Sequence, residues 1–191
     1  HRDLHSFPTR RSSDLNKSLG QNFLIDDEVI LDIVNGANIG ENDLVIEIGP
    51  GLGSMTKLLL EKAKKVICIE LDKKMIKILC ERFFDKNNLE IINADVLKVD
   101  LNTLIKEEKA KNNIENVKIV ANLPYYITTP IIEHVIESKI NFKKFTIMVQ
   151  KEVADRFLAS TGTRDYGYIT QNVNQYLFHM QLPYNLKIIT S

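Results

Sequence analysis

Apolar residues along this chain gather in short, nearly continuous runs that are separated by segments with helical spacing. β-Branched runs of this kind are typical of strands buried on both faces of a sheet, whereas half-exposed strands alternate between apolar and polar residues. The sequence therefore predicts five buried strands. They cover residues 44–48, 65–70, 89–94, 117–122 and 145–150.

Amphipathic segments lie between these strands and predict helices. Regular alternation of strand and helix is typical of an α/β fold, here a doubly wound, Rossmann-like parallel sheet with right-handed crossovers. The first predicted helix is capped by Asp26 or Asp27 and ends at Gly36. Three more cover residues 54–63, 73–84 and 101–112. A fifth is capped by Thr129 with Pro130 at its first position, and a sixth begins near Lys151.

The two ends of the chain carry weaker patterns. Residues 1–15 mix Arg, Ser, His and Pro without a period, so we expect a non-native or disordered arm, with a basic arm that touches phosphates as the alternative. Residues 16–191 are expected to form one domain. Its last part predicts a helix over 168–178 and a sixth strand within 179–189. A weak strand alone would leave an unpaired sheet edge, so the domain is expected to be incomplete at its C-terminus.

Composition narrows the class of protein. The chain has 191 residues, 44% of them apolar, and equal numbers of basic and acidic residues, 25 each, so net charge points to no nucleic-acid partner. Cys68 and Cys80 have no metal-ligand spacing and form no disulfide framework, which favours a reducing, cytoplasmic location and no metal. No apolar run approaches the roughly 20 residues that span a bilayer, so no membrane partner is expected.

A glycine-rich loop, Gly49-Pro50-Gly51-Leu52-Gly53, connects the first strand to the next helix. Glycines allow a tight turn and a close approach of a ligand to the backbone, and Glu70 at the end of the second strand is placed to accept ribose hydroxyls. The spacing differs from the dinucleotide pattern G-x-G-x-x-G, and Lys57 lies too far along to complete a phosphate loop. A cofactor with a ribose and no phosphates, such as S-adenosylmethionine, fits this pattern better. The alternative is an ordinary turn.

Two further acids belong to this region. Asp95 follows the third strand, where it is placed to accept a hydrogen bond from an adenine amino group or, alternatively, to cap the next segment. Glu47 precedes the loop, and we expect it to be a buried acid that accepts hydrogen bonds from the loop amides. The acidic character of the site suits the positive sulfonium of S-adenosylmethionine.

The fourth strand ends in Asn122-Leu123-Pro124-Tyr125, at the sheet edge where ligands of such folds bind. The amine of adenine is a poor nucleophile because its lone pair is delocalised into the ring. The Asn122 amide oxygen and the Leu123 carbonyl are candidate acceptors for its two N–H bonds, Pro124 fixes the turn, and Tyr125 offers a face for stacking. Catalysis then consists of positioning and electrostatics. A packed proline turn is the alternative.

Six segments together resemble the ribosomal RNA adenine dimethyltransferases, in particular the small-subunit type. They are SLGQNFL (18–24), VIEIGPGLGSMT (45–56), IELD (69–72), NADVL (93–97), NLPYYITTPII (122–132) and QKEVADR (150–156). The resemblance implies a monomer that transfers methyl groups from S-adenosylmethionine to N6 of two adjacent adenines in small-subunit rRNA. It implies that Asn22 and Leu24 hold the methionine end of the cofactor, that Gly49 and Gly51 approach its backbone, and that Glu70 and Asp95 bind its ribose and its adenine. Asn122 is implied to contact both the cofactor and the target amine, between which it lies.

The sequence also departs from this family, because the Phe-x-Pro-x-Pro-Lys-Val segment, a closing strand and a small helical domain do not appear before Ser191. We therefore expect cofactor binding with weak or no methylation by this form. Three alternatives stay open. They are a 23S rRNA adenine methyltransferase of the macrolide-resistance type, an rRNA-binding assembly factor without turnover, and a nicotinamide-dependent oxidoreductase.

Overall fold

The computed structural model describes residues 27–123, 125–149, 154–155, 159 and 186–190, with only the backbone described for Tyr125 and 186–190. The first half contains α1 (Asp27–Ala37), β1 (Asp43–Ile48), α2 (Ser54–Lys62), β2 (Lys65–Glu70), α3 (Lys73–Arg82) and β3 (Leu89–Asn93). The second half contains the 3₁₀ turn η3 (Val96–Lys98), α4 (Leu101–Lys111), β4 (Asn116–Asn122), the 3₁₀ turn η4 (Tyr125–Ile127), α5 (Thr128–Glu137), β5 (Lys144–Val149) and β6 (Leu186–Thr190).

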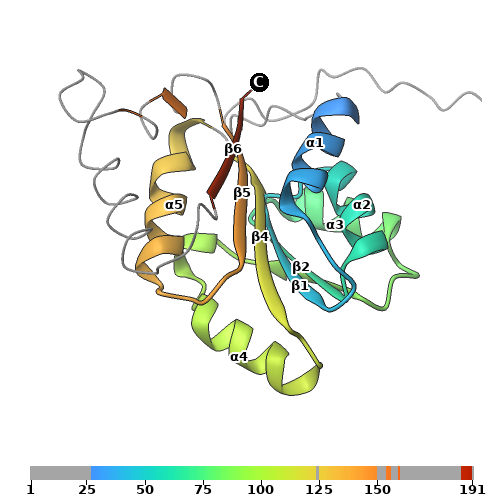
Figure 1. The fold of residues 1–191 in the computed structure, drawn as a ribbon. Helices are drawn as coiled ribbons and strands as arrows, with labels where there is room; N and C mark the ends of the chain where they lie inside the picture. The colour runs from blue at the N-terminus through green and yellow to red at the C-terminus, as the bar shows by residue number, and fades with distance from the viewer. Residues whose placement is uncertain (1–26, 124, 150–153, 156–158, 160–185, 191) are drawn as a thin grey trace, which may run out of the picture.

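The strands form one parallel sheet in the order β3-β2-β1-β4-β5-β6, as Figure 1 shows. The predicted doubly wound parallel sheet is confirmed. Strand order reverses between β1 and β4, because β2 and β3 lie on one side of β1 and the later strands on the other. Folds of this kind bind ligands at that reversal, beyond the carboxyl ends of the strands.

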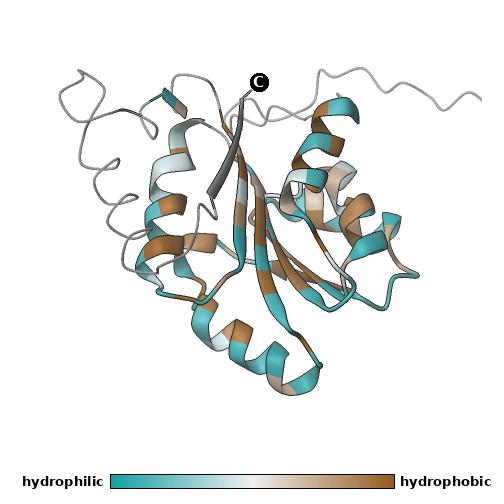
Figure 2. Ribbon diagram, in the orientation of Figure 1, coloured by the Kyte–Doolittle hydropathy of each residue, from teal (hydrophilic) through white to brown (hydrophobic). Residues whose placement is uncertain are grey.

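Alternate residues of β1 point to opposite faces of the sheet, and each face is covered by helices. Leu44, Ile46 and Ile48 join one buried cluster with α4 and α5, whereas Val45 joins a second cluster with α1, α2 and α3. Figure 1 shows these two helical layers on either side of the sheet, and Figure 2 shows the predominantly apolar strands between them. Burial on both faces explains why β1, β2, β4 and β5 lack an alternating pattern, whereas β3 at the sheet edge is only half-buried, so its predicted burial was wrong.

The first five predicted strands agree with the observed ones to within one residue, but two of the predicted helix caps were wrong. α1 continues through Gly36 to Ala37, and it is Asn38 that takes the left-handed conformation after it, with φ of 50°. Asparagine tolerates this conformation better than most residues. Thr129 is not a cap, since α5 begins at Thr128 directly after η4, and Pro130 is its third residue. The turn already present in η4 removes the need for a side-chain cap.

The end of the chain is described only in part. β6 pairs in parallel with β5 at the sheet edge, which confirms the end of the predicted sixth strand. Residues 154 and 155 are helical, in agreement with the helix predicted after the fifth strand. The arm of residues 1–15 and the helix predicted over 168–178 lie outside the described residues.

Candidate active site

The glycine loop turns sharply at the carboxyl end of β1. Gly49, Gly51 and Gly53 all have positive φ, at 68°, 58° and 79°. The Gly49 amide donates to the Ile69 carbonyl (3.0 Å), which ties the loop to β2, and the Gly53 amide closes a turn onto the Pro50 carbonyl (2.9 Å). Gly53 also caps α2 without any side-chain hydrogen bond. The loop therefore presents backbone rather than side chains at the start of α2.

Gly53 also has no room for a side chain. A Cβ atom at this position would lie 2.6 Å from Phe83 Cε2 and 2.7 Å from Leu79 Cδ2, both on or just after α3. Contacts that short do not occur between real Cβ atoms and their neighbours, and the positive φ adds strain for any residue other than glycine. The end of α3 is thus packed directly against the loop.

Glu70 lies beside the loop, as the topology predicts. Its side chain is buried, and its Oε2 accepts a hydrogen bond from the Gly51 amide (3.3 Å) while Oε1 accepts one from the Asp72 amide (2.9 Å). The Asn93 side chain donates to the Glu70 carbonyl (3.0 Å) and so fixes the end of β2 against β3. A carboxylate oxygen can accept two hydrogen bonds, and each oxygen of Glu70 accepts one from the backbone, which leaves capacity for ligand hydroxyls.

The end of β4 adjoins the same loop. Ile48 is in register with Ala121, which places Gly49 beside Asn122, and a Cβ on Gly49 would lie 3.9 Å from the Asn122 carbonyl oxygen. Asn122 is half-buried, and Leu123 is buried with its amide donating to the Met148 carbonyl (3.4 Å). These positions bring the Asn-Leu tip and the glycine loop together.

Other predicted residues are placed less directly. Asp95 Oδ1 accepts a hydrogen bond from the Leu97 amide (3.1 Å) and caps η3, so the capping interpretation is confirmed, and the adenine contact stays a prediction. Tyr125 lies in η4, where its backbone alone is described. Asn22, Leu24 and Pro124 lie outside the described residues.

Glu47 is fully buried, as predicted, but its expected hydrogen bonds to the loop amides were wrong. Its Oε2 instead accepts hydrogen bonds from the Thr56 hydroxyl (2.7 Å) and the Cys68 thiol (3.3 Å), because β1 directs this side chain toward α2 and β2. Its Oε1 has no partner among the described residues. Burial raises the pKa of Glu47 from 4.5 to about 7, although both hydrogen bonds act to lower it. Burial next to this acid also raises the pKa of Cys68.

Sequence reasoning missed Arg82, which donates a hydrogen bond from its guanidinium to the Leu52 carbonyl inside the glycine loop (2.7 Å). It also missed Asn93, although that residue stands at the start of the NADVL segment. A polar residue at the end of a predicted strand signals Asn93, whereas no local pattern signals Arg82. Its contact depends on how α3 packs against the loop.

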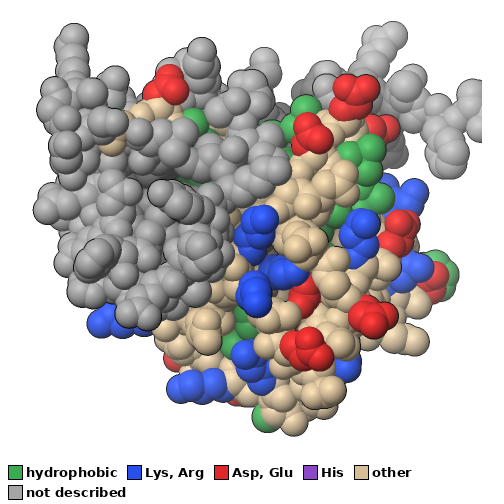
Figure 3. Space-filling model, viewed as in Figure 1, with side chains coloured by type: hydrophobic (Ala, Val, Ile, Leu, Met, Phe, Trp, Pro, Cys, Tyr) green, Lys and Arg blue, Asp and Glu red, His purple; other side chains and the backbone are tan. Residues whose placement is uncertain are grey.

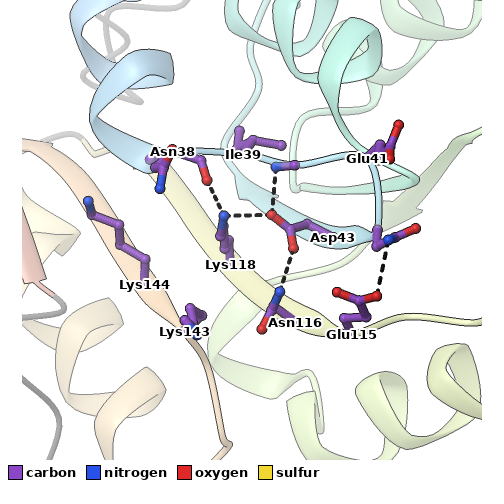
Figure 4. Close-up of a pocket in the computed structure, with 12 residues that line it drawn as sticks. Asn38, Ile39, Glu41, Asp43, Glu115, Asn116, Lys118, Lys143 and Lys144 are labelled. Atoms are coloured by element: carbon purple, nitrogen blue, oxygen red, sulfur yellow. Dashed lines mark hydrogen bonds and ion pairs between the residues drawn. The ribbon is translucent and has the colours of Figure 1, made fainter.

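A groove of about 600 Å³ opens at the opposite, amino end of the strands, lined by residues 37–43 and by the starts of β4 and β5. Figure 4 shows Lys118 at its centre, held by Asp43 (2.5 Å) and by the Asn38 carbonyl. Lysines and acids are intermixed on this face of the molecule (Figure 3). None of the predicted site residues that the structure describes lines this groove, because they gather at the other end of β1, about 20 Å away.

Within the described ranges, no group of His, Cys, Asp or Glu side chains is arranged to hold a metal ion. The same part of the chain contains no helix long and apolar enough to cross a membrane. Among the described residues, the predicted site presents backbone amides and carbonyls together with the side chains of Glu70, Asp95 and Asn122.

Comparison with known proteins first defines the class of fold. The N-methyltransferase NodS from Bradyrhizobium japonicum has a similar structure, with a TM-score of 0.53 at 14% identity over 80% of this chain and 84% of that protein. At this identity the likeness concerns the fold alone. The fold is the Rossmann-like fold of methyltransferases.

Sequence comparison then identifies the family. The chain belongs to the ribosomal RNA adenine dimethylase family, whose sequence profile matches residues 12–182. Ribosomal RNA small subunit methyltransferase A of Alkaliphilus oremlandii is 52% identical over 161 residues, and that of Clostridium perfringens 53%. These matches cover 84% of this chain, which spans about 55% of the length of these curated relatives.

Solved structures of related proteins agree with this assignment. A dimethyladenosine transferase from Plasmodium falciparum is 34% identical, with a TM-score of 0.66 over 78% of this chain and 50% of that one. The 23S rRNA methyltransferase ErmE is 30% identical, with a TM-score of 0.61 over 76% of this chain and 53% of that one.

Proposed function

We propose that the protein binds S-adenosylmethionine at the carboxyl end of its sheet and transfers methyl groups to N6 of two adjacent adenines in small-subunit rRNA. The observation that carries this proposal is the contact between the glycine loop and the tip of β4, where Gly49 and Asn122 are neighbours. A donor bound on the loop and an amine held at the tip then lie next to each other. The family assignment and the small-subunit relatives support this substrate class.

The residues present fit a cofactor that has a ribose but no phosphate. The loop offers close backbone approach through Gly49 and Gly51, and the buried Glu70 carboxylate lies against it. The spacing of the loop glycines also differs from the dinucleotide pattern G-x-G-x-x-G, in which the helix N-terminus faces a pyrophosphate. When bound, S-adenosylmethionine supplies an electrophilic methyl group on a positively charged sulfur. Asn22, Leu24 and Asp95 complete the cofactor site in this proposal.

Asn122 and Leu123 hold the target amine. The Asn122 amide oxygen and the Leu123 carbonyl accept its two N–H bonds, which directs the nitrogen lone pair away from the ring and toward the loop. Pro124 fixes the turn, and Tyr125 stacks on the base, a contact worth about 1–3 kcal/mol. In this proposal the protein acts as a monomer. Its location is cytoplasmic, because its substrate belongs to the small ribosomal subunit.

Cofactor binding is tested by calorimetric titration of the chain, once with S-adenosylmethionine and once with NAD. We expect binding of the first and none of the second. Replacement Glu70→Ala should raise the dissociation constant at least about tenfold, because a charged hydrogen-bond acceptor is lost. The matched control is Glu81→Ala, an exposed acid on α3. Binding of NAD instead of S-adenosylmethionine contradicts the proposal.

The substrate is tested with the protein expressed at the full length of its gene, labelled cofactor, and unmethylated small and large ribosomal subunits in separate reactions. We expect N6,N6-dimethyladenosine in small-subunit rRNA only. Label in 23S rRNA identifies the macrolide-resistance type of activity, and rRNA binding without label identifies an assembly factor. Either result overturns the proposed substrate or reaction.

Asn122→Ala in the same protein separates catalysis from binding. Because the proposed contact of Asn122 belongs to the transition state, kcat should fall at least about 100-fold while the dissociation constant of the cofactor stays within about twofold. Equal losses in both quantities indicate a structural role for Asn122 instead.

A further inference from the structure

The peptide group between Leu52 and Gly53 is held from both sides. Its N–H donates to the Pro50 carbonyl (2.9 Å), and its carbonyl accepts a hydrogen bond from the Arg82 guanidinium (2.7 Å). The two groups point in opposite directions across one planar unit, so each contact opposes rotation of the whole peptide.

This part of the loop needs such contacts because of its composition. Gly49, Gly51 and Gly53 alternate with other residues, and all three have left-handed φ. Glycine reaches positive and negative φ with similar ease, so a loop of this kind samples several conformations unless neighbouring groups select one. When only a fraction of molecules has the binding conformation, the apparent affinity for a ligand falls by that fraction.

Arg82 is itself fixed in place by the end of α3. Its guanidinium carbon lies 5.4 Å from the centre of the Phe83 ring, within the range of cation–π attraction. Phe83 and Leu79 pack so closely against Gly53 that they leave no room for a Cβ atom at that position. The last turn of α3 therefore meets the loop twice, through an apolar contact on Gly53 and through a hydrogen bond on Leu52.

We propose that Arg82 is a positioning residue, whose hydrogen bond to the Leu52 carbonyl holds the glycine loop in the conformation that binds the cofactor. This inference rests on the proposed function, because it takes the loop to be the site of S-adenosylmethionine. Arg82 acts through the loop backbone and contacts no reacting atom.

The test compares Arg82→Met with Arg82→Lys and the unaltered chain. Methionine keeps an apolar stem over Phe83 but loses the donors, whereas lysine restores one donor. We expect the dissociation constant of S-adenosylmethionine to rise about three- to tenfold in Arg82→Met, as for loss of one hydrogen bond, and Arg82→Lys to restore most of the affinity. Lys77→Met is the matched control, since Lys77 is an exposed cation on the same helix that pairs with Glu81.

A second measurement needs no ligand. Hydrogen exchange of the Gly53 amide should be faster in Arg82→Met than in the unaltered chain, because the peptide has lost one of its two constraints. Lys77→Met should leave this rate unchanged. The melting temperature of the ligand-free Arg82→Met protein should stay within about 3 °C of the original, as expected for a surface substitution.

The outcomes separate the two proposals. An unaltered chain that binds no S-adenosylmethionine overturns the proposed function. If the unaltered chain binds and Arg82→Met binds equally well with unchanged Gly53 exchange, only the role of Arg82 is overturned. Weakened binding that lysine does not restore, together with a large loss of melting temperature, also overturns it, because that pattern describes a general packing role.

Discussion

Asp43 and Glu47 stand four residues apart on β1, both almost completely buried, yet their pKa values move in opposite directions. Burial alone raises the pKa of either acid. For Asp43 this effect is outweighed by hydrogen bonds from Lys118, the Gly40 amide and Asn116, so its pKa falls below the ordinary value. Glu47 receives two hydrogen bonds on one oxygen, and among the described residues no cation pairs with it, so burial raises its pKa to about 7.

The difference shows that partners, rather than depth, decide the charge state of a buried acid. At the amino end of β1, Asp43 and Lys118 form an ion pair that connects β1 with β4, and both side chains accept or donate further hydrogen bonds. At the carboxyl end, below the glycine loop, burial raises the pKa of Glu47 to about 7. The Asp43–Lys118 ion pair therefore has a structural role. The partly hydrogen-bonded Glu47 makes the region beside the loop sensitive to pH.

The largest expected effect comes from breaking the ion pair. Lys118→Met leaves Asp43 buried without a cation, so the free energy of unfolding at pH 7 should fall by about 3–5 kcal/mol, measured by denaturant titration. The double variant Asp43→Asn with Lys118→Met removes both charges and should recover most of the loss. The pair contributes stability above the ordinary pKa of Asp43, 3.8, and loses it as pH falls through the lowered value, so the loss should shrink in acid. A single variant that loses under about 1 kcal/mol contradicts this interpretation.

The pH dependence of Glu47 should have the opposite sign. Because its pKa is higher in the folded chain, about 7, than the ordinary 4.5, the folded state binds the extra proton, and stability falls as pH rises between these values. From pH 4 to pH 8 the contribution amounts to roughly 3 kcal/mol. Glu47→Gln has no such proton, so subtracting its unfolding curve from the unaltered one isolates the slope and cancels the other acids. Parallel curves would show that Glu47 titrates normally.

A smaller effect is expected at Thr56, whose hydroxyl donates to Glu47. Thr56→Val keeps the shape and removes the donor, and should cost about 1–2 kcal/mol. The cost should be greater at pH 8 than at pH 5, because the hydroxyl stabilises the ionised carboxylate more than the protonated one. Unfolding free energies at the two pH values check this. A cost independent of pH indicates that Thr56 contributes packing alone.

The sequence predicts the sheet well because its signals are local. Each buried strand is a continuous apolar run, and the closeness of Gly49, Glu70 and Asn122 follows from parallel strands ending at one edge. Helix ends are harder to predict, since the start of α5 depends on the turn before it rather than on Thr129.

Side-chain partners separated along the chain are the part that sequence reasoning does not reach. Glu47 meets Thr56 and Cys68 only through the register of β1 with β2 and the placement of α2. The ion pair of Lys118 and Asp43 likewise depends on the register of β1 with β4. In each case the residue type is visible in the sequence, but the packing of the folded chain decides what it contacts.

The smallest change in stability is expected at Thr146, a buried polar residue that contrasts with the hydrogen-bonded Thr56. The Thr146 hydroxyl on β5 is fully buried and has no hydrogen-bond partner among the described residues. Thr146→Val removes a desolvated hydroxyl without changing the shape, so the free energy of unfolding should stay equal or rise by up to about 1 kcal/mol, in contrast to Thr56→Val. Denaturant titration of both variants under the same conditions measures the contrast. If Thr146→Val costs as much as Thr56→Val, then partners do not decide the effect of a buried polar group in this sheet.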